Sequence, residues 1–352
     1  MLIARLGRVL GSTLIVAWAL SAQASVGFTQ IAGKAPDGPI TVFYPSSGES
    51  RTMTRGPFKL QVAQNGDPVR GNRRLVVISH GSGGSPWVFY DLAAALVEAG
   101  FVAALPEHYR DNYKDPSQPG PESWKRRPLE VSHAIDVVST DSRFASLLAP
   151  DKVGVYGMSA GGHTALSLAG GRWSPSLFRA HCDAHLAEDF PACVGLATRL
   201  TGGALDGVRM TIARWILDWK FSDAAWYSHE DPRVAAVIAG VPFAADFDPS
   251  SLASPPVPLA IVSARKDKWL RPEFHSDAVL RACRSCERLA DFANGGHGAL
   301  LSPFPTNVTG PAADLLGDPP GFDRAESLEV NRKIAAFFRK HLLPLPDAQK
   351  RR

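Results

Sequence analysis

Short apolar runs alternate with helix-like segments along most of the chain, and no other feature restricts the possible folds as strongly. The run LVVISH at 75–80 is apolar on both faces of a strand, so both faces must be buried. We expect strands at the runs 26–31, 39–44, 75–80, 101–105, 152–156, 234–239, 258–263 and 288–292. Helical patterns predict helices at 90–99, 129–148, 160–169, 273–284 and 328–341. The alternation predicts a mostly parallel α/β sheet of about eight strands, flanked by helices.

Three segments interrupt the alternation. Residues 45–72 are polar and rich in turn formers, and residues 106–128 combine charges with prolines, so both are expected to be loops. Residues 172–230 hold a tryptophan-rich run and are predicted to form a helical insertion, or lid, after the helix at 160–169. The expected organisation is a single domain over 25–345.

A basic and then apolar segment opens the chain. Arg5 and Arg8 precede an apolar run that ends near Leu20, and Ala22-Gln23-Ala24 follows as a small-x-small site. This pattern predicts a signal peptide at 1–24 and a periplasmic or secreted protein with no membrane span after cleavage. The apolar run is short for a bilayer span, and an uncleaved anchor helix is the alternative.

The composition is typical of a globular protein and gives little support for a nucleic-acid partner. Of the 352 residues, 45% are hydrophobic and 20% are charged. The formal net charge of +4 includes Arg5 and Arg8, so a chain without the signal peptide is close to neutral. The basic clusters, at 71–75, at 124–127 and in a C-terminal tail at 346–352, are short and isolated.

The chain has four cysteines, Cys182, Cys193, Cys283 and Cys286. An even number in an exported chain predicts two disulfides. Pairing between sequence neighbours, Cys182 with Cys193 and Cys283 with Cys286, is favoured among the three possible connectivities. The C-x-x-C pair is also compatible with a redox or zinc site, but no second such pair accompanies it.

Polar and glycine-rich residues follow four of the expected strands. In an open α/β sheet, functional groups gather at the carboxyl ends of the strands. The four ends carry, in chain order, His80-Gly81-Ser82-Gly83-Gly84, Gly157-Met158-Ser159-Ala160-Gly161, Ala264-Arg265-Lys266-Asp267 and Asn294-Gly295-Gly296-His297. A serine, an aspartate and a histidine are therefore expected at one edge of the sheet.

Ser159 lies at the centre of a G-x-S-x-G motif between a strand and a helix, the pattern of a nucleophile elbow. A side chain at Gly157 or Gly161 would clash with neighbouring backbone in such a turn. The turn lifts the Ser159 hydroxyl above the sheet, and the N-terminus of the following helix favours developing negative charge. We predict that Ser159 is a nucleophile; a plain turn is the alternative.

A serine nucleophile needs a base, and His297, in a glycine-rich loop, is the best candidate. His80 is the rival, but its place at the start of the glycine loop favours an anchoring role. His163 lies in the helix after Ser159 and is expected to pack or bond locally.

The base in turn needs a carboxylate that fixes its tautomer. Asp267 follows the strand at 258–263 and is the preferred candidate, with Asp246 and Asp248 as alternatives. The oxyanion hole is predicted to use two backbone amides, that of Ala160 after the nucleophile and that of Ser82 in the glycine loop.

The insertion contains two further groups of interest. His181 and His185 are four residues apart and would share a helix face, either as metal ligands or, as we prefer, as part of a polar lid surface. No metal or other cofactor is expected. Two interpretations of the tryptophans stay open, as the wall of an acyl pocket or as the core of the insertion: Trp215, Trp219 and Trp226.

These residues resemble the α/β-hydrolase superfamily over nearly all of the chain after residue 24. More narrowly, the segments HGSGG, LPEHYRDN and GMSAGGHTAL resemble the dienelactone hydrolase-like group, which includes platelet-activating-factor acetylhydrolases. The resemblance implies a cofactor-independent Ser-His-Asp hydrolase of small-molecule or lipid carboxylic esters.

The chain departs from this group at two points. Dienelactone hydrolases proper use a cysteine nucleophile, whereas this chain has Ser159. In animal platelet-activating-factor acetylhydrolases the triad acid follows the strand after the elbow helix, but here Ala239–Phe243 holds no acid, which favours Asp267. We expect an exported serine esterase for short acyl chains; the alternatives are an amidase or peptidase, a phospholipid acetylhydrolase, and a non-catalytic binding protein.

Overall fold

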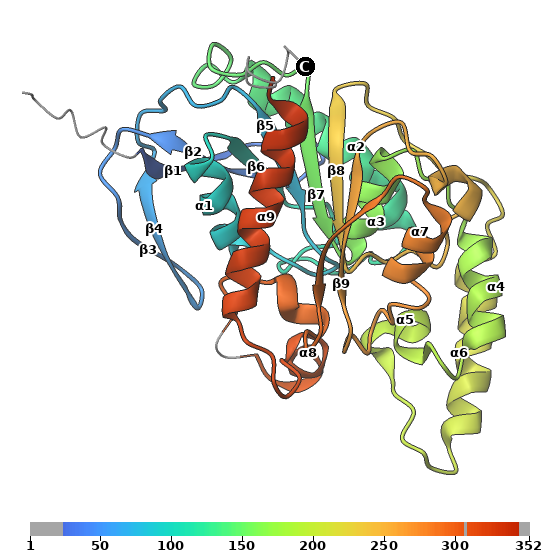
Figure 1. The fold of residues 1–352 in the computed structure, drawn as a ribbon. Helices are drawn as coiled ribbons and strands as arrows, with labels where there is room; N and C mark the ends of the chain where they lie inside the picture. The colour runs from blue at the N-terminus through green and yellow to red at the C-terminus, as the bar shows by residue number, and fades with distance from the viewer. Residues whose placement is uncertain (1–23, 306–307, 345–352) are drawn as a thin grey trace, which may run out of the picture.

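A ten-stranded, mostly parallel sheet forms the centre of the molecule in a computed structural model that describes residues 24–305 and 308–344 (Figure 1). The strands are β1 (Ser25–Ile31), β2 (Ile40–Ser46), β3 (Arg51–Arg55), β4 (Phe58–Gln64), β5 (Leu75–Ser79), β6 (Val102–Pro106), β7 (Val153–Met158), β8 (Val234–Gly240), β9 (Leu259–Ala264) and β10 (Glu287–Phe292). Their order is β10-β9-β8-β7-β5-β6-β2-β1-β4-β3. All neighbours from β6 to β10 pair in parallel, and β2 is antiparallel to both β6 and β1.

Helices cover both faces of the sheet (Figure 1). One face packs against α1 and α9, and the other against α2 and α3. The α-helices are α1 (Tyr90–Glu98), α2 (Pro121–Thr140), α3 (Ala160–Leu168), α4 (Pro175–His185), α5 (Phe190–Val194), α6 (Asp206–Lys220), α7 (Ser276–Ala282), α8 (Gly310–Leu316) and α9 (Ala325–Leu342). Four short 3-10 helices are η1 (Pro86–Phe89), η2 (Gly195–Ala197), η3 (Pro249–Leu252) and η4 (His297–Leu300).

The continuous apolar runs are explained by this double covering. In β5, Val77 belongs to the core on the α2 and α3 side, whereas Val76 and Ile78 belong to the core on the α1 and α9 side. None of these three side chains is exposed to solvent. The predicted class, an α/β protein with a mostly parallel sheet flanked by helices, is confirmed.

The prediction of about eight strands was too low, because residues 45–72 contain β3 and β4 rather than only loop. These strands form an antiparallel hairpin at the end of the sheet. In β4, Phe58, Leu60 and Val62 are buried while the residues between them are exposed. This alternation is typical of a strand with one solvated face, and the polar residues of that face give the segment its loop-like composition.

The helix α2 begins eight residues earlier than the predicted start at Leu129 and ends at Thr140 instead of Leu148. Gly120, with a φ of +94°, precedes the helix, and Pro121 occupies its first turn, where a proline costs little because that amide has no helical acceptor. Pro128 lies inside the helix and is buried. The expectation of loop to residue 128 was therefore wrong, since this proline does not mark the start of the helix.

The segment 172–230 contains α4, α5 and α6, as the helical prediction required. Both predicted disulfides are present, Cys182–Cys193 between α4 and α5 and Cys283–Cys286 after α7. The inner side of α6 is formed by Ala213 and Leu217, which are buried.

One of the two interpretations of the tryptophans, as the core of the insertion, is wrong. Trp215 is 73% exposed, Trp219 is 78% exposed and Trp226 is 49% exposed, so none of them is buried in that core. Trp215 and Trp219 belong to α6, which lies at the edge of the molecule in Figure 1.

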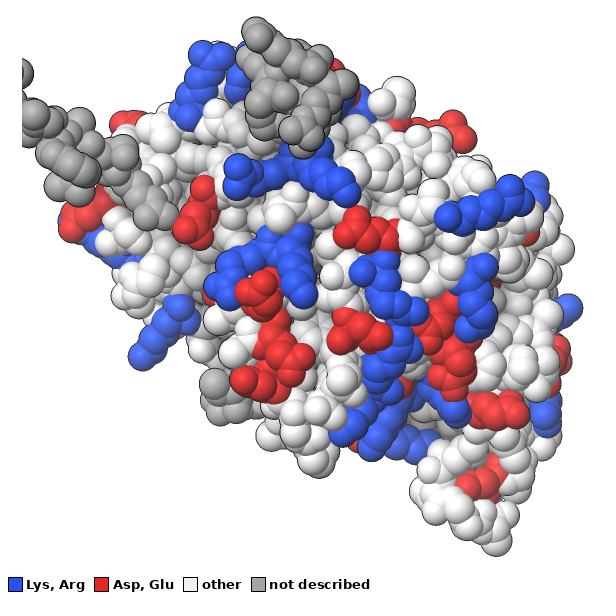
Figure 2. All heavy atoms as spheres, in the orientation of Figure 1, with Lys and Arg blue, Asp and Glu red and all other residues white. Residues whose placement is uncertain are grey.

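The predicted signal peptide, apart from Ala24, and the basic tail lie outside the described residues. Within 24–305 and 308–344, no helix has the length and hydrophobicity of a transmembrane span. On the face in Figure 2, basic and acidic side chains are interspersed rather than separated into fields of one sign.

Candidate active site

The candidate residues lie at the carboxyl ends of neighbouring parallel strands. β5 and β7 are adjacent, with Ser79 opposite Gly157, so the glycine loop after β5 lies beside the turn after β7. The strand β5 lies between β6 and β7, so the connection from β5 to β6 and the later one to β7 lead to opposite sides of β5. This reversal of the strand order makes the position a topological switch point. Binding sites of open α/β sheets form at such points. Asp267 and His297 follow β9 and β10, farther along the same edge.

Ser159 adopts a strained backbone conformation, as a residue at the centre of a nucleophile elbow would. Its φ is +59°, a left-handed value that is uncommon for a residue with a side chain. A Cβ added at Gly157 would lie 1.8 Å from the Gly161 carbonyl oxygen, and one at Gly161 would lie 2.0 Å from the Ser79 carbonyl oxygen. Both distances are far below van der Waals contact, so these two positions require glycine.

The structure brings Ser159, His297 and Asp267 together in one hydrogen-bonded chain. His297 Nε2 lies 3.0 Å from Ser159 Oγ, and His297 Nδ1 lies 2.7 Å from Asp267 Oδ2. An ionised carboxylate only accepts hydrogen bonds, so Nδ1 carries the ring proton and Nε2 is free to accept from the serine hydroxyl. His297 is 5% exposed and Asp267 is 4% exposed, whereas Ser159 is partly accessible.

Asp267 is itself held in place by backbone amides. Its Oδ1 accepts hydrogen bonds from the amides of Trp269, at 2.8 Å, and Leu270, at 2.9 Å. These two bonds leave Oδ2 directed at His297. The carboxylate is therefore fixed in the orientation that a triad acid needs.

The rival residues are engaged elsewhere. His163 Nε2 contacts Asp246 at 3.0 Å, and both side chains are fully buried. The His163 ring stacks against Trp124 of α2. Asp248 pairs with Arg172 at 2.7 Å. His80 contacts the Gly81 carbonyl through Nδ1 at 2.8 Å, which fits the expected anchoring role.

Backbone amides are available beside the Ser159 hydroxyl. Ala160 is the first residue of α3, so its N–H has no acceptor within the helix. Gly81 approaches Ser159 so closely that an added Cβ would lie 3.7 Å from Ser159 Oγ. Among the described residues, the amides of Gly81 and Ser82 have no hydrogen-bond acceptor. The glycine loop therefore offers two free donors, of which the sequence suggested only that of Ser82.

A second serine-histidine-carboxylate chain lies beneath the glycine loop. His108 contacts Ser79 Oγ through Nε2 at 2.7 Å and Glu130 through Nδ1 at 2.5 Å. Ser79 is fully buried and the other two residues are nearly so, so no substrate reaches this serine. No sequence pattern points to His108 or Glu130, because they lie on a loop and a helix that carry no G-x-S-x-G motif.

His80 should make the stability of the fold depend on pH. Burial lowers the pKa of this imidazole well below its usual range, and the nearby His108 and Arg127 lower it further. The geometry agrees, because the His108 amide donates to His80 Nε2 at 3.3 Å and protonation would abolish that acceptor. Below pH ~6.5 the unfolded chain gains a proton that the folded chain does not bind, so the free energy of unfolding decreases as pH falls.

We expect the His80 contribution to be about 1.4 kcal/mol per pH unit below pH ~6.5, until the folded-state pKa is reached. Urea unfolding of the wild type and of His80→Gln at several pH values between 8 and 5 measures it. The variant should show the shallower dependence; equal slopes would contradict the assignment.

A cleft of about 770 Å³ has Asp267, Trp269 and His297 among its lining residues. The insertion lines this cleft directly through Glu188 and Pro191. Its Arg199 also pairs with Asp314 at 3.0 Å and stacks over the Trp269 ring at 4.5 Å. The segment before α6 therefore contacts residues that border the candidate active site.

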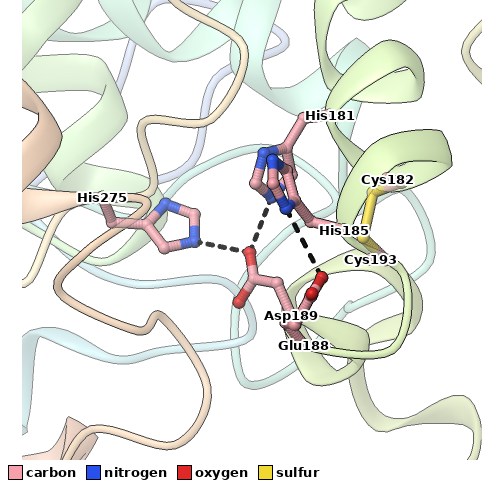
Figure 3. The surroundings of a disulfide bond; sticks show 7 residues. All are labelled: His181, Cys182, His185, Glu188, Asp189, Cys193 and His275. Atoms are coloured by element: carbon pink, nitrogen blue, oxygen red, sulfur yellow. Dashed lines mark hydrogen bonds and ion pairs between the residues drawn. A yellow bond between two sulfur atoms is a disulfide. The ribbon is translucent and has the colours of Figure 1, made fainter.

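Only one of the two histidines of α4, His181, belongs to a largely buried polar cluster that joins the insertion to the domain; His185 is 42% exposed (Figure 3). His181 Nε2 lies 2.8 Å from Asp189 Oδ2, and His275 Nε2 approaches the same oxygen at 3.3 Å. His185 contacts Glu188 at 3.4 Å instead. Within the described part of the chain, no group of three or more such side chains has the arrangement of a metal site.

Comparison with known proteins supports the fold. No protein-family model and no curated protein matches the sequence. The structure is similar to that of a ferulic acid esterase from Streptomyces cinnamoneus, with a TM-score of 0.58 and 17% sequence identity over 94% of this chain and 95% of that chain. The shared architecture is a mostly parallel α/β sheet flanked by helices, consistent with an α/β-hydrolase fold.

Proposed function

We propose that this protein is a serine hydrolase of carboxylic esters. The observation that carries the proposal is the chain of contacts from Ser159 Oγ to His297 and from His297 to Asp267, at 3.0 Å and 2.7 Å. The strained elbow and the free amides beside it add the other parts that acyl transfer requires. The fold shared with an esterase is compatible with this function.

In the proposed reaction, Ser159 Oγ attacks the ester carbonyl carbon while its proton passes to His297 Nε2. Asp267 stabilises the imidazolium, and the amides of Ala160 and Ser82 bind the oxyanion of the tetrahedral intermediate. Collapse of the intermediate expels the alcohol, which takes the proton from His297, and leaves an acyl-serine. Water then attacks the acyl-serine by the same route, and the acid leaves with Ser159 restored.

The setting of the site supports an exported enzyme with a lid. Two disulfides suit an oxidising compartment, as the predicted signal peptide does. The contact of Arg199 with Asp314 and Trp269 brings the insertion to the border of the cleft, so we propose that 172–230 limits the size of the acyl group. Carboxylic esters with short acyl chains are the proposed substrates.

A panel of p-nitrophenyl esters of two to twelve acyl carbons, with matched p-nitroanilides and a phospholipid, tests this function. We expect turnover of the esters, highest for short acyl chains, and little turnover of the anilides. Preference for the anilides would favour an amidase or peptidase, and preference for the phospholipid a phospholipid acetylhydrolase. No turnover of any substrate would favour a non-catalytic binding protein.

A further inference from the structure

A buried carboxylate, that of Asp111, holds the glycine loop after β5. Its Oδ1 accepts hydrogen bonds from Ser82 Oγ at 2.6 Å and from the Gly83 amide at 3.0 Å. Gly83 has a φ of +62°, and the Gly84 amide donates to the Gly81 carbonyl at 3.0 Å, so 81–84 form a tight turn. Asp111 therefore binds the middle of this turn from one side.

Arg127, on α2, holds the same loop through its carbonyl oxygens. It donates to the His80 carbonyl through Nη1 and reaches the Gly81 carbonyl through Nη2 at 3.4 Å. Nη2 also binds Asp111 Oδ2 at 2.8 Å, and Ser123 Oγ donates to the same carboxylate oxygen at 2.6 Å. Both side chains of this ion pair are 0% exposed.

These contacts determine where the loop amides point. In a planar trans peptide the C=O and the following N–H point in opposite directions. Because Arg127 binds the carbonyls of His80 and Gly81, the amides of Gly81 and Ser82 point away from Arg127. Gly81 lies against Ser159, where an added Cβ would be 3.3 Å from the serine Cβ, so the loop that carries these free amides lies beside the Ser159 side chain.

We propose that Asp111 and Arg127 are positioning residues that fix the glycine-loop amides of Gly81 and Ser82, of which the Ser82 amide binds the oxyanion in the proposed reaction. This inference rests on the proposed ester hydrolase function and adds two residues to its machinery. Neither side chain contacts the substrate; both act through the turn at 81–84. Oxyanion donors accelerate acyl transfer only when they are held in place before the charge develops.

The ionic character of the pair fits this role. A buried ion pair adds little stability over packed apolar side chains, so stability alone is a weak reason for one here. Burial disfavours the charge of Asp111, but Arg127 and the hydrogen bonds from Ser123 and Ser82 outweigh it and lower the pKa of the carboxyl. Asp111 therefore stays ionised at neutral pH and accepts from both loop donors.

Two variants test the proposal, with rates expressed per active site titrated with a fluorophosphonate. Asp111→Asn puts an amide in place of a carboxylate, and we expect kcat for p-nitrophenyl acetate to fall about 10- to 100-fold with KM little changed. Because loss of one partner of a buried ion pair can prevent folding, Ser82→Ala is the second variant. It removes one hydrogen bond to Asp111 and should lower kcat about 3- to 10-fold.

A transition-state analogue separates positioning from general stability. Binding of an alkyl trifluoromethyl ketone, which forms an oxyanion on Ser159, should weaken in proportion to the loss of kcat/KM in both variants. The control is Asp231→Asn, which disrupts the contact with Arg233 at 2.7 Å. Both residues lie just before β8, at the amino-terminal edge of the strands and so across the sheet from Ser159. That variant should lower the melting temperature but keep wild-type kcat per titrated site.

The possible outcomes distinguish this inference from the function on which it rests. A wild-type protein without ester turnover would overturn the proposed function and this inference with it. An active wild type whose Asp111→Asn and Ser82→Ala variants keep wild-type kcat and analogue affinity would overturn the positioning role alone.

Discussion

Replacing Ser159 by alanine should lower kcat for ester hydrolysis by about 10⁵- to 10⁶-fold, the largest effect of any single substitution in this protein. Among the residues that the structure describes, the Ser159 hydroxyl is the hydrogen-bond partner of His297 Nε2, at 3.0 Å. Without it the acyl-enzyme cannot form, and only the oxyanion donors and substrate binding remain. The measurement is steady-state hydrolysis of p-nitrophenyl acetate, with circular dichroism as the check on folding.

The combination of Ser159→Ala with His297→Ala makes this prediction sharper. If the two residues act as one unit, the double variant should be about as slow as either single variant, rather than slower by the product of both effects. Multiplicative losses, or a Ser159→Ala variant that keeps a tenth of the wild-type rate, would contradict the assignment of Ser159.

Replacing Asp267 by asparagine should lower kcat by about 10⁴-fold while the fold stays intact. The amides of Trp269 and Leu270, which bind Oδ1 at 2.8 and 2.9 Å, would keep the asparagine oxygen in that position. The amide NH₂ would then face His297 Nδ1 and force the ring proton onto Nε2. In that tautomer His297 cannot take the proton of Ser159.

Asp246→Asn is the matched control for this prediction, because Asp246 is also a buried aspartate in contact with a histidine, His163, at 3.0 Å. It should affect stability but leave kcat per folded molecule near the wild-type value. A large loss of kcat in Asp246→Asn together with a small loss in Asp267→Asn would instead assign Asp246 as the triad acid. Kinetics at the pH optimum of the wild type, with unfolding curves for all three proteins, decide between them.

The sequence predicts most of the sheet and the geometry at its edge because both depend on local patterns. A strand buried on both faces must be continuously apolar, and β5, β7, β8 and β9 are recognisable for that reason. Gly157 and Gly161 are likewise required by contacts within one strand-turn-helix unit. The chain order of Ser159, Asp267 and His297 then follows from the order of the strand ends.

What the sequence does not reveal depends on contacts between distant segments. Asp111 lies in a polar loop and Arg127 in a basic cluster that looks solvated, and only the packing of α2 against the sheet brings the two together with the glycine loop. Trp215 and Trp219 mislead in the opposite way. Their hydrophobicity suggests burial, but the helical phase of α6 is set by Ala213 and Leu217 on its inner side.

Reaction of the folded wild-type protein with a fluorophosphonate, followed by mass spectrometry of the labelled peptide, tests whether Ser159 is the activated nucleophile. We expect one equivalent of label on Ser159, lost in the Ser159→Ala variant and after denaturation in urea. Folded protein that takes up no label, or takes it up on another residue, would contradict this expectation.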